Sequence, residues 1–361
     1  MSTVSPAPSA APRILAIRRR YLGDIVLLGC VFRNLRLHWP GAELQLLTEA
    51  GYAGVAALNP DLNRIHTFPS GFMAWPGFVG ELRRQRFTHV LDFDNSDRTA
   101  LTARLSGAPV RLTQTRETAP LRLGRLYTQL VPVSNETYHR TSIVDTYLAL
   151  LQPLGVPAVS RETHLVPPTE DTAWAQRILG VGPGSGVSPG RRLLVHPGSR
   201  SRFRLWPADR FAAVCDRVQD ELGVQVFLVA GPGEQSLVRE IRTAAQSHLV
   251  ALDEELSVGQ LAALARACGL VLCHDSGPMH IAAASGARVV ALYGSQNTAI
   301  WRPLGEGHTL LQTPLPCTCL PDTPTPCVRH DSYRNYCVRK LTVDEVFAAL
   351  KAALAGAATL T

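Results

Sequence analysis

The sequence predicts an α/β protein built from two doubly wound domains. Short apolar segments alternate with helix-like segments, a Pro/Gly-rich stretch interrupts this alternation before it restarts, and 361 residues exceed one typical domain. We expect an N-terminal domain over residues 13–168, a linker region over 169–190 and a C-terminal domain over 191–361. Residues 1–12, rich in Ser, Ala and Pro, are expected to form a disordered lead-in.

Each half shows the same alternation of short apolar runs and helix-like segments. Strands are expected where such a run ends in a polar or Gly-rich turn: 13–18, 43–47, 64–68, 88–93, 109–113, 193–196, 225–230, 249–252, 270–273 and 289–293. Helices are expected where apolar residues recur with helical period: 24–37, 75–85, 96–105, 142–155, 174–179, 207–222, 234–245, 258–267, 278–285 and 342–355. This spacing favours parallel strands with helical crossovers, and two such halves imply a ligand cleft between them.

Composition narrows the class of protein. Hydrophobic residues at 46% and charged residues at 18% describe a soluble globular chain, and no apolar run is long enough to span a bilayer. Since residues 1–12 lack a basic segment followed by an apolar one, no signal peptide is predicted and a cytoplasmic location is expected.

The net charge of +7 comes almost entirely from arginine, because only Lys340 and Lys351 are lysines. Arginine suits acidic ligands or an anionic membrane face, so peripheral contact with the inner face of the cytoplasmic membrane is compatible with the sequence. A genome-wide preference for Arg over Lys would give the same number of arginines without any acidic ligand. Nucleic acid is disfavoured as a partner, because no basic run is interleaved with aromatic residues.

The eight cysteines fall into two groups. Four of them lie in apolar runs and are expected to be small core residues: Cys30, Cys215, Cys268 and Cys273. The other four form a late cluster without paired C-x2-C spacing: Cys317, Cys319, Cys327 and Cys337. Reduced structural thiols, a disulfide and a metal site all remain open for this cluster.

The polar turn that follows residues 270–273 is the most informative segment. An apolar strand ends there in Asp275-Ser276-Gly277-Pro278, and a helix of small residues begins at once. The first N–H groups of a helix have no intrahelical acceptor and carry partial positive charge, so such a turn suits a phosphate. His280 adds an imidazole one turn later. Asp275 or Ser276 could instead serve only as a helix cap.

A second turn, in the other half, contains a carboxylate. Gly23 permits a sharp turn, and Asp24 stands at the start of the following helix beside the arginines of residues 18–20. A carboxylate projecting into the cleft and kept ionised by arginine would suit a general base. Asp24 could alternatively be a simple N-cap.

Two further turns in the C-terminal half add groups that suit a nucleotide. Ser199 follows a Pro-Gly turn and is followed by several arginines including Arg204, so this loop could hold a pyrophosphate or could be a solvated basic loop. Glu234 ends a Gly-rich turn, where its carboxylate could accept ribose hydroxyls or simply begin the next helix.

Several common sites are absent from the sequence. No G-x-G-x-x-G follows the first strand, and there is no P-loop and no G-x-S-x-G nucleophile elbow. Asp92-Phe93-Asp94 has the D-x-D spacing of a metal-dependent transferase, but it is interpreted as a structural or acceptor-side feature in preference to a metal site.

Taken together, these segments resemble glycosyltransferase family 9, the heptosyltransferases of lipopolysaccharide core synthesis. The resemblance covers nearly the whole chain after Pro12 and rests on five motifs: R-x-Y-L-G-D at 19–24, H-P-G-S at 196–199, R-L-W-P at 204–207, A-G-P-G-E at 230–234 and D-S-G-P-M-H at 275–280. Two details differ from the family. Arg204 stands where the family usually has Lys, and the Cys tail has C-x-C in place of a wider spacing.

The resemblance implies a GT-B architecture, with the acceptor on the N-terminal Rossmann-like domain and the nucleotide sugar on the C-terminal one. It implies inverting transfer of heptose from ADP-heptose to a lipid-linked saccharide of the lipopolysaccharide-core type, with no metal and no cofactor. Asp24 would be the catalytic base. The donor would be bound by Gly23, Ser199, Arg204, Glu234, Asp275, Ser276, Gly277 and His280.

Acceptor contacts are assigned to Arg98, Arg116 and Arg122, which could bind an acidic lipid-linked sugar or could be solvated surface charges. Three other functions are compatible with such a chain. It could use another nucleotide sugar on a different cell-envelope glycan, it could be a sugar-nucleotide epimerase, or it could bind sugar nucleotides without catalysis. Retention of Asp24 argues against the last of these.

Overall fold

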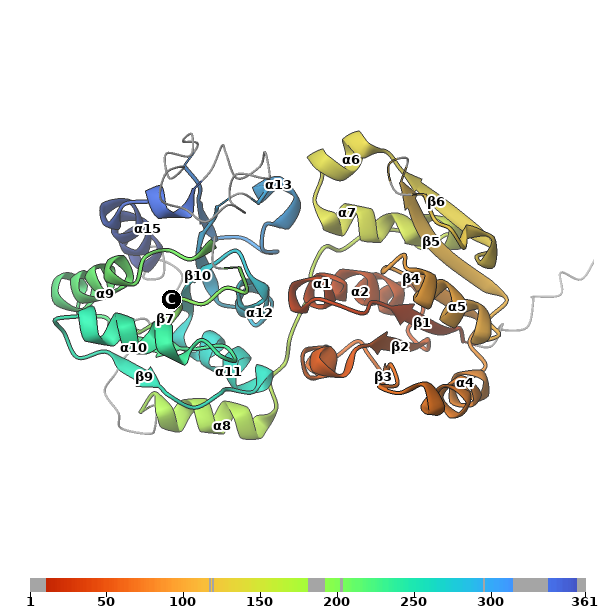
Figure 1. Ribbon diagram of the computed structural model, residues 1–361, viewed down its shortest axis with the longest axis horizontal. Helices are drawn as coiled ribbons and strands as arrows, with labels where there is room; N and C mark the ends of the chain where they lie inside the picture. The colour runs from red at the N-terminus through yellow and green to blue at the C-terminus, as the bar shows by residue number, and fades with distance from the viewer. Residues whose placement is uncertain are drawn as a thin grey trace, which may run out of the picture. The chain divides into compact units, whose positions relative to one another are not determined.

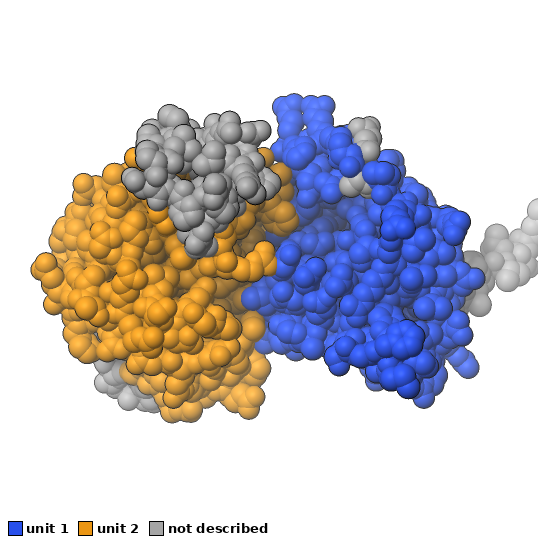
Figure 2. Space-filling model, in the orientation of Figure 1, with its two compact units in different colours: residues 1–163 blue, residues 164–361 orange. Residues whose placement is uncertain are grey.

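The computed structural model describes residues 11–116, 118, 120–180, 192–201, 204–294, 296–313 and 337–355. The chain divides into two compact units, residues 1–163 and 164–361 (Figure 2). Each unit contains a six-stranded parallel sheet. The predicted fold class, two Rossmann-like α/β domains, is confirmed.

Unit 1 has the strand order β3-β2-β1-β4-β5-β6 (Figure 1). Its strands are β1 (Arg13–Ile17), β2 (Glu43–Thr48), β3 (Arg64–Thr67), β4 (His89–Asp92), β5 (Val110–Arg116) and β6 (Gln129–Val133). Its helices are α1 (Leu22–Leu27), α2 (Gly29–His38), α3 (Ala53–Ala56), α4 (Trp75–Arg84), α5 (Asp97–Leu105), α6 (Asn135–Arg140) and α7 (Ile143–Leu148). Short 3-10 segments are η1 (Ala50–Tyr52), η2 (Phe72–Ala74), η3 (Gly124–Leu126) and η4 (Ala149–Leu154).

Unit 2 repeats this topology, with the strand order β12-β11-β10-β7-β8-β9. Its strands are β7 (Arg192–His196), β8 (Gln225–Val229), β9 (Val250–Leu252), β10 (Leu270–His274), β11 (Arg288–Leu292) and β12 (Thr309–Leu311). Its helices are α8 (Thr169–Ile178), α9 (Ala208–Leu222), α10 (Gln235–Ala244), α11 (Val258–Cys268), α12 (Gly277–Ala284), α13 (Thr298–Trp301) and α15 (Val343–Ala355), with a 3-10 turn η7 (Val338–Lys340).

The sheet of unit 2 is buried on both faces, which explains its continuously apolar strands. Along β7, Leu193 and Val195 point into one core with α9 and α15, whereas Leu194 points into a second core with α8, α11 and α12. In Figure 1, α8 lies beside α11 and α15 beside α9, although each pair is far apart in the sequence. Burial of alternate side chains on opposite faces therefore fixes the register of the central strands.

The boundary between the units differs from the expected one. Leu165 is buried and its N–H donates to the carbonyl of Ala284, 2.9 Å away at the end of α12, so the chain joins unit 2 before residue 169. The helix expected inside a linker is α8, which packs on α11. The carboxylate of Asp171 lies where a Cβ of Gly259 would stand, so the two helices approach closely.

Most predicted elements agree with the structure to within a few residues, and the exceptions have local causes. The helix expected over 24–37 is divided at Leu28, and the one over 142–155 is α7 followed by the 3-10 segment η4, which contains Pro153. The strands β6 and β12 were not predicted. Both are edge strands. β12 is partly buried throughout, and β6 buries only Val131 and Val133 and contains Pro132, so neither has a continuous apolar run.

Among the described residues, no helix is both long and apolar enough to cross a membrane. The lead-in predicted over residues 1–12 falls almost wholly outside the described residues.

Candidate functional site

The predicted site residues lie at the carboxyl ends of the central strands in each unit. In unit 1 the strand order reverses between β1 and β4, and in unit 2 it reverses between β7 and β10. Ile17 lies opposite Asp92 in the first pair and His196 opposite Cys273 in the second, so each pair of strands ends at the same level. Such reversal points are where open α/β sheets bind ligands.

Asp24 is buried in unit 1 and held by three donors. Arg18 forms an ion pair with its Oδ1, and the Tyr147 hydroxyl donates to the same oxygen at 2.7 Å. The other oxygen, Oδ2, accepts a long bond of 3.4 Å from the N–H of Tyr21. Two strong donors therefore bond to one oxygen, while within the described part of the chain the second oxygen has a single weak partner.

The groups beside Asp24 keep their protonated forms. Burial raises the pKa of Tyr147 well above its ordinary value, so its hydroxyl remains a donor. Burial opposes the charge of Arg18, but the acidic groups around it outweigh that effect and raise its pKa. The sequence placed arginines near Asp24. It offered no sign of Tyr147, which is 123 residues away and comes from α7.

Neither Asp24 nor Gly23 occupies the local position that the sequence suggested. The helix α1 begins at Leu22, so Asp24 lies in its first turn and Tyr21 stands at the N-cap position. Gly23 is the second residue of that helix and has no turn conformation that would demand glycine.

The two carboxylates of the D-x-D sequence face different partners. Asp92 is fully buried, accepts a 2.5 Å bond from the Tyr127 hydroxyl, and has its pKa raised to about 6 by burial. Asp94 instead lies 3.8 Å from a guanidinium nitrogen of Arg19. Among the residues that the structure describes, no cluster of three His, Cys, Asp or Glu side chains could hold a metal ion.

In unit 2, Arg204 and Asp275 meet although 71 residues separate them. A guanidinium nitrogen of Arg204 lies 3.3 Å from Oδ2 of Asp275 and 3.4 Å from its carbonyl oxygen. Burial raises the pKa of Asp275 to about 6, and the positive charge of Arg204 acts against that rise. One nitrogen of the guanidinium is thus bound to the turn, and the Arg204 side chain remains partly exposed.

The start of α12 presents free backbone donors. Ser276 is the N-cap residue, but its hydroxyl donates to the His274 carbonyl at 3.3 Å and caps no helical N–H. In the part of the chain that the structure describes, the N–H groups of Ser276 and Gly277 have no recorded acceptor. Both residues are partly exposed, and His280 is buried one turn further on. This helix start has the donors that bind an anion.

The loop that carries Arg204 is tied down by the neighbouring Trp206. Its backbone N–H donates to Nε2 of His274 at 2.8 Å, and its indole N–H donates to the Leu341 carbonyl at 2.9 Å. Burial lowers the pKa of His274 to about 3, so the imidazole is neutral and can accept. His274 stands inside the predicted segment, but its role as an anchor was not foreseen.

Glu234 does not cap the helix that it precedes. Its Oε2 accepts the N–H of Gly231 at 3.0 Å and lies 3.9 Å from Nε2 of His196. The carboxylate also fills the space beside Gly198, because a Cβ built there would stand 1.7 Å from Oε2. The turns after β7 and β8 are therefore brought together, with Ser199 partly exposed at their edge.

The three arginines assigned to the acceptor occupy different surroundings. Arg98 stacks over Phe68 and Trp75, with its guanidinium carbon 4.7 and 5.2 Å from the ring centres. Arg122 is largely exposed and lies 3.4 Å from Asp97. Arg116 ends β5 at the same edge of the sheet as Asp24 and lies 4.2 Å from the ring centre of Tyr138.

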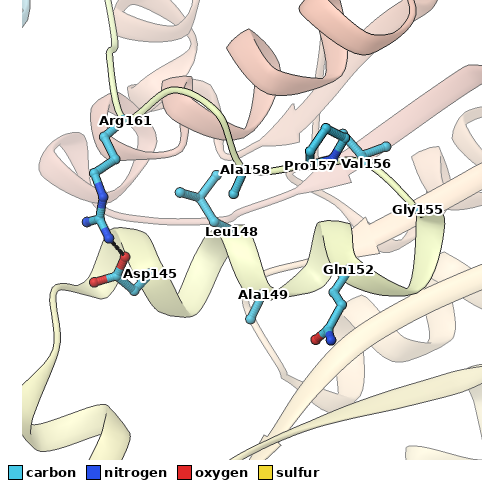
Figure 3. Close-up of a pocket in the computed structure, with 9 residues that line it drawn as sticks. All are labelled: Asp145, Leu148, Ala149, Gln152, Gly155, Val156, Pro157, Ala158 and Arg161. Atoms are coloured by element: carbon cyan, nitrogen blue, oxygen red, sulfur yellow. Dashed lines mark hydrogen bonds and ion pairs between the residues drawn. The ribbon is translucent and has the colours of Figure 1, made fainter.

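A hollow of about 500 Å³ lies on another part of unit 1 (Figure 3). One side is the face of α7 and η4 formed by Asp145, Leu148, Ala149 and Gln152, and Arg161 pairs with Asp145 at its end. None of the predicted site residues lines it. Tyr147 is not among its lining residues, so this hollow is separate from the Asp24 site.

The cysteines expected in the core are confirmed there: Cys30, Cys215, Cys268 and Cys273 are all buried. Burial raises the pKa of the Cys30 thiol to about 12, as expected for an inert core thiol. Cys317, Cys319 and Cys327 lie outside the described residues, and Cys337 has a free thiol. The alternatives for this cluster stay open.

Two Rossmann-like units, each with a parallel sheet and polar groups at its reversal point, define a GT-B fold, and solved structures have the same fold. A glycosyl transferase of family 9 from Veillonella parvula superposes with a TM-score of 0.81 at 21% identity, covering 96% of this chain and 98% of that one. An E. coli ADP-heptose lps heptosyltransferase II gives a TM-score of 0.75 at 21% identity, covering 96% and 99%.

Sequence comparison identifies the family. The model of glycosyltransferase family 9 (heptosyltransferase) matches residues 77–329, which is more than half of the chain. Lipopolysaccharide heptosyltransferase 3 of E. coli is 26% identical over 298 residues, covering 79% of this chain and 84% of that protein. The chain therefore belongs to glycosyltransferase family 9 and is a glycosyltransferase.

Proposed function

We propose that this enzyme transfers heptose from ADP-heptose to a lipid-linked saccharide of the lipopolysaccharide-core type, with inversion at the anomeric carbon. The observation that carries the proposal is the pairing of Arg204 with Asp275 beside the free donors of α12. It is supported by membership of the family and by relatives that are named lipopolysaccharide heptosyltransferases. The E. coli protein of similar fold is named for ADP-heptose.

The donor half of the proposal assigns the leaving diphosphate to unit 2. As the bond to the sugar breaks, negative charge grows on the diphosphate and must be neutralised. Arg204 and the N–H groups of Ser276 and Gly277 supply positive charge and hydrogen bonds there, with Ser199 nearby, so we propose that no metal is needed. Asp275 and His280 would border the sugar and the phosphates.

Glu234 is proposed to bind the ribose of the donor. A carboxylate accepts hydrogen bonds from the two ribose hydroxyls, and Glu234 is held in place by Gly231 and by the space beside Gly198. Its partly exposed side chain leaves lone pairs available for a ligand. Gly23 remains a proposed donor contact in unit 1.

The acceptor half of the proposal assigns general-base catalysis to Asp24. Because Arg18 and Tyr147 both bond to Oδ1, we assign proton abstraction to Oδ2. This oxygen would take the proton of the acceptor hydroxyl as that hydroxyl attacks the anomeric carbon. Of the three arginines, Arg116 is proposed as the first contact of an acidic acceptor, since it ends β5 at the edge of the sheet that holds Asp24. Arg98 and Arg122 remain weaker candidates.

Substitution of Asp24 by Asn tests the base. We expect turnover with ADP-heptose and a core-type acceptor to fall roughly 100- to 10,000-fold, because an amide cannot accept the proton. Affinity for ADP should not change, since the diphosphate is assigned to unit 2. Initial-rate kinetics and calorimetric titration with ADP measure the two quantities.

Asp94→Asn is the matched control, because it removes another carboxylate paired with arginine at the same edge of the sheet. Unchanged turnover in Asp24→Asn, or a loss of turnover confined to Asp94→Asn, would show that Asp24 is not the general base. Product formed from a UDP-sugar or a GDP-sugar instead of ADP-heptose would overturn the donor assignment.

A further inference from the structure

We infer that His196 is a positioning residue for Glu234, the proposed ribose contact. His196 is the last residue of β7 and lies opposite Cys273 of β10. On its other side β7 pairs with β8, and the turn after β8 ends in Glu234. Because the imidazole is almost wholly buried, its effect on a ligand passes through its neighbours. This role rests on the assignment of the ribose to Glu234, and it adds the group that orients the carboxylate.

The carboxylate of Glu234 lies in a cradle formed by backbone and imidazole. The N–H of Gly231 donates to Oε2 at 3.0 Å, and Nε2 of His196 lies 3.9 Å from the same oxygen. A Cβ built on Gly198 would stand 1.7 Å from Oε2, and one built on Gly231 would stand 2.7 Å from it. Two glycines thus leave the space that the carboxylate fills, with Oε2 turned toward the protein. Among the described residues Oε1 accepts no hydrogen bond, so it is available to a ligand hydroxyl.

His196 faces Glu234 as a neutral donor. Burial lowers the pKa of the imidazole, and the Glu234 carboxylate acts in the opposite direction. A neutral imidazole has one N–H, and its other nitrogen is an acceptor. Since a carboxylate oxygen can only accept, the tautomer that suits this arrangement has its proton on Nε2. His196 therefore directs an N–H dipole at Oε2 without adding a charge to the donor site.

The distance between the two groups indicates an orienting interaction and not a full hydrogen bond. Nε2 and Oε2 are 3.9 Å apart, which is beyond hydrogen-bond distance. The attraction between an N–H dipole and a carboxylate persists at this distance where water is excluded, and the two side chains are only 6% and 23% exposed. Rotation of Glu234 out of its cradle would take the carboxylate away from this buried donor, which is unfavourable. The imidazole therefore favours the orientation in which Oε2 points inward.

A glutamate held in one orientation binds ribose hydroxyls more tightly than a mobile one. A free Glu side chain loses rotamer freedom when a ligand immobilises it, and a side chain that is already restricted has less to lose. Loss of the His196 N–H should therefore weaken the contribution of the ribose hydroxyls to binding. The contribution of the diphosphate should not change, because it is assigned to Arg204 and the start of α12.

Binding of ADP and of 2′,3′-dideoxy-ADP tests this role, because the second compound keeps the base and the diphosphate but lacks both ribose hydroxyls. For the wild type we expect ADP to bind roughly tenfold to a hundredfold more tightly than 2′,3′-dideoxy-ADP, as for hydrogen bonds to a charged group. In His196→Phe, which keeps a buried ring without its N–H, this ratio should fall about fivefold. The affinity for 2′,3′-dideoxy-ADP itself should stay the same. Calorimetric titration of the full-length protein measures these affinities.

Further variants make the test specific. His196→Gln should keep the wild-type ratio, because its amide N–H can take the place of the imidazole Nε2–H. His196→Asn should lower the ratio as His196→Phe does, since its shorter amide does not reach Glu234, and it serves in place of His196→Phe where that variant does not fold. The matched control is His308→Phe, the same exchange at a partly buried histidine before β12, at the amino ends of the strands of unit 2.

The outcomes separate this role from the ribose assignment itself. A ratio that falls in Glu234→Gln but stays unchanged in His196→Phe and His196→Asn would overturn the positioning role and leave the ribose on Glu234. An equal loss of both affinities in His196→Phe, or a ratio equally low in His196→Gln, would also overturn it, because either result would show a packing role. A ratio unchanged in Glu234→Gln would overturn the ribose assignment, and the positioning role with it.

Discussion

At the scale of single residues, the geometry around Asp24 separates its two oxygens. Oδ1 accepts from Arg18 and from Tyr147, whereas the one partner of Oδ2 among the described residues is a backbone N–H at 3.4 Å. A carboxylate fixed through one oxygen keeps the other in a constant direction, which is what a general base needs. Tyr147 acts through Asp24, so we regard it as a positioning residue.

Removal of the Tyr147 hydroxyl tests this role. In Tyr147→Phe we expect kcat to fall about fivefold, since one net hydrogen bond is worth about 1 kcal/mol, with little change in the KM for the donor. Steady-state kinetics with varied donor concentration measure both quantities.

Tyr127→Phe provides the comparison for Tyr147→Phe. It removes a similar hydroxyl bond, from Tyr127 to the buried Asp92, in the same unit. A comparable loss of thermal stability in both variants, with kcat lowered only in Tyr147→Phe, would separate positioning from a general structural effect. Equal kcat in wild type and Tyr147→Phe would contradict it.

At the scale of elements, the end of β10 serves two purposes. Asp275 anchors Arg204, and His274 accepts the backbone N–H of Trp206, so one turn orients the basic loop at two points. The small residues of α12 then allow the helix to pack against α11 and β10. The buried histidine makes this connection dependent on pH.

His274 is expected to link the stability of the fold to pH. Burial lowers its pKa in the folded state from 6.5 to about 3, so between these pH values the unfolded chain binds a proton that the folded protein does not. Its contribution is complete above pH 6.5 and is lost as the pH falls toward 3. Relative to His274→Gln, the wild type should lose up to about 1.4 kcal/mol of unfolding free energy per pH unit in that window.

Urea unfolding of wild type and His274→Gln at a series of pH values measures this difference. Gln can still accept the Trp206 N–H but does not titrate. Burial raises the pKa of Asp92 and of Asp275 to about 6, so between pH 3.8 and 6 the folded protein holds protons that the unfolded chain releases. The stability contributed by these two protons is lost as the pH rises from 3.8 to 6. That opposing effect is common to both proteins and cancels in the comparison. Parallel stability curves would show that His274 is not the linked group.

At the scale of the whole molecule, one topology is used twice with different chemistry at each reversal point. Unit 1 presents a carboxylate held by an arginine and a tyrosine, and unit 2 presents an arginine with free helix donors. Each unit has its own buried cores. The donor and the acceptor chemistry can therefore be tested separately.

Hydrogen exchange with ADP should show this division. A ligand that binds the folded state lowers local opening where it binds. We expect protection in unit 2 at residues 197–201, 231–235 and 275–280, and little change around Asp24. AMP should protect less because it lacks the diphosphate. Arg204→Gln should weaken ADP binding roughly ten- to hundredfold. Protection confined to the hollow on α7 and η4 would refute the donor assignment.

Much of this protein could be inferred from local patterns. Continuous apolar runs such as 193–196 and 270–273 predicted the buried central strands, and the turns that follow them predicted which residues stand at the carboxyl edge. That works because burial on both faces and helix-start chemistry depend on near neighbours in the chain. The short edge strands β6 and β12 and the position of α8 in unit 2 lacked such a pattern.

The contacts that make these residues a site arise between distant segments. Tyr147 reaches Asp24 from 123 positions away, Trp206 bonds to His274 across 68, and Arg204 meets Asp275 across 71. No periodicity in the chain encodes such pairs, because they follow from the order in which parallel strands assemble and from the close packing of the helices over them. The sequence by itself thus determined the residue types and the turns that carry them. Only tertiary packing decided which oxygen of Asp24 stays available and which groups anchor Arg204.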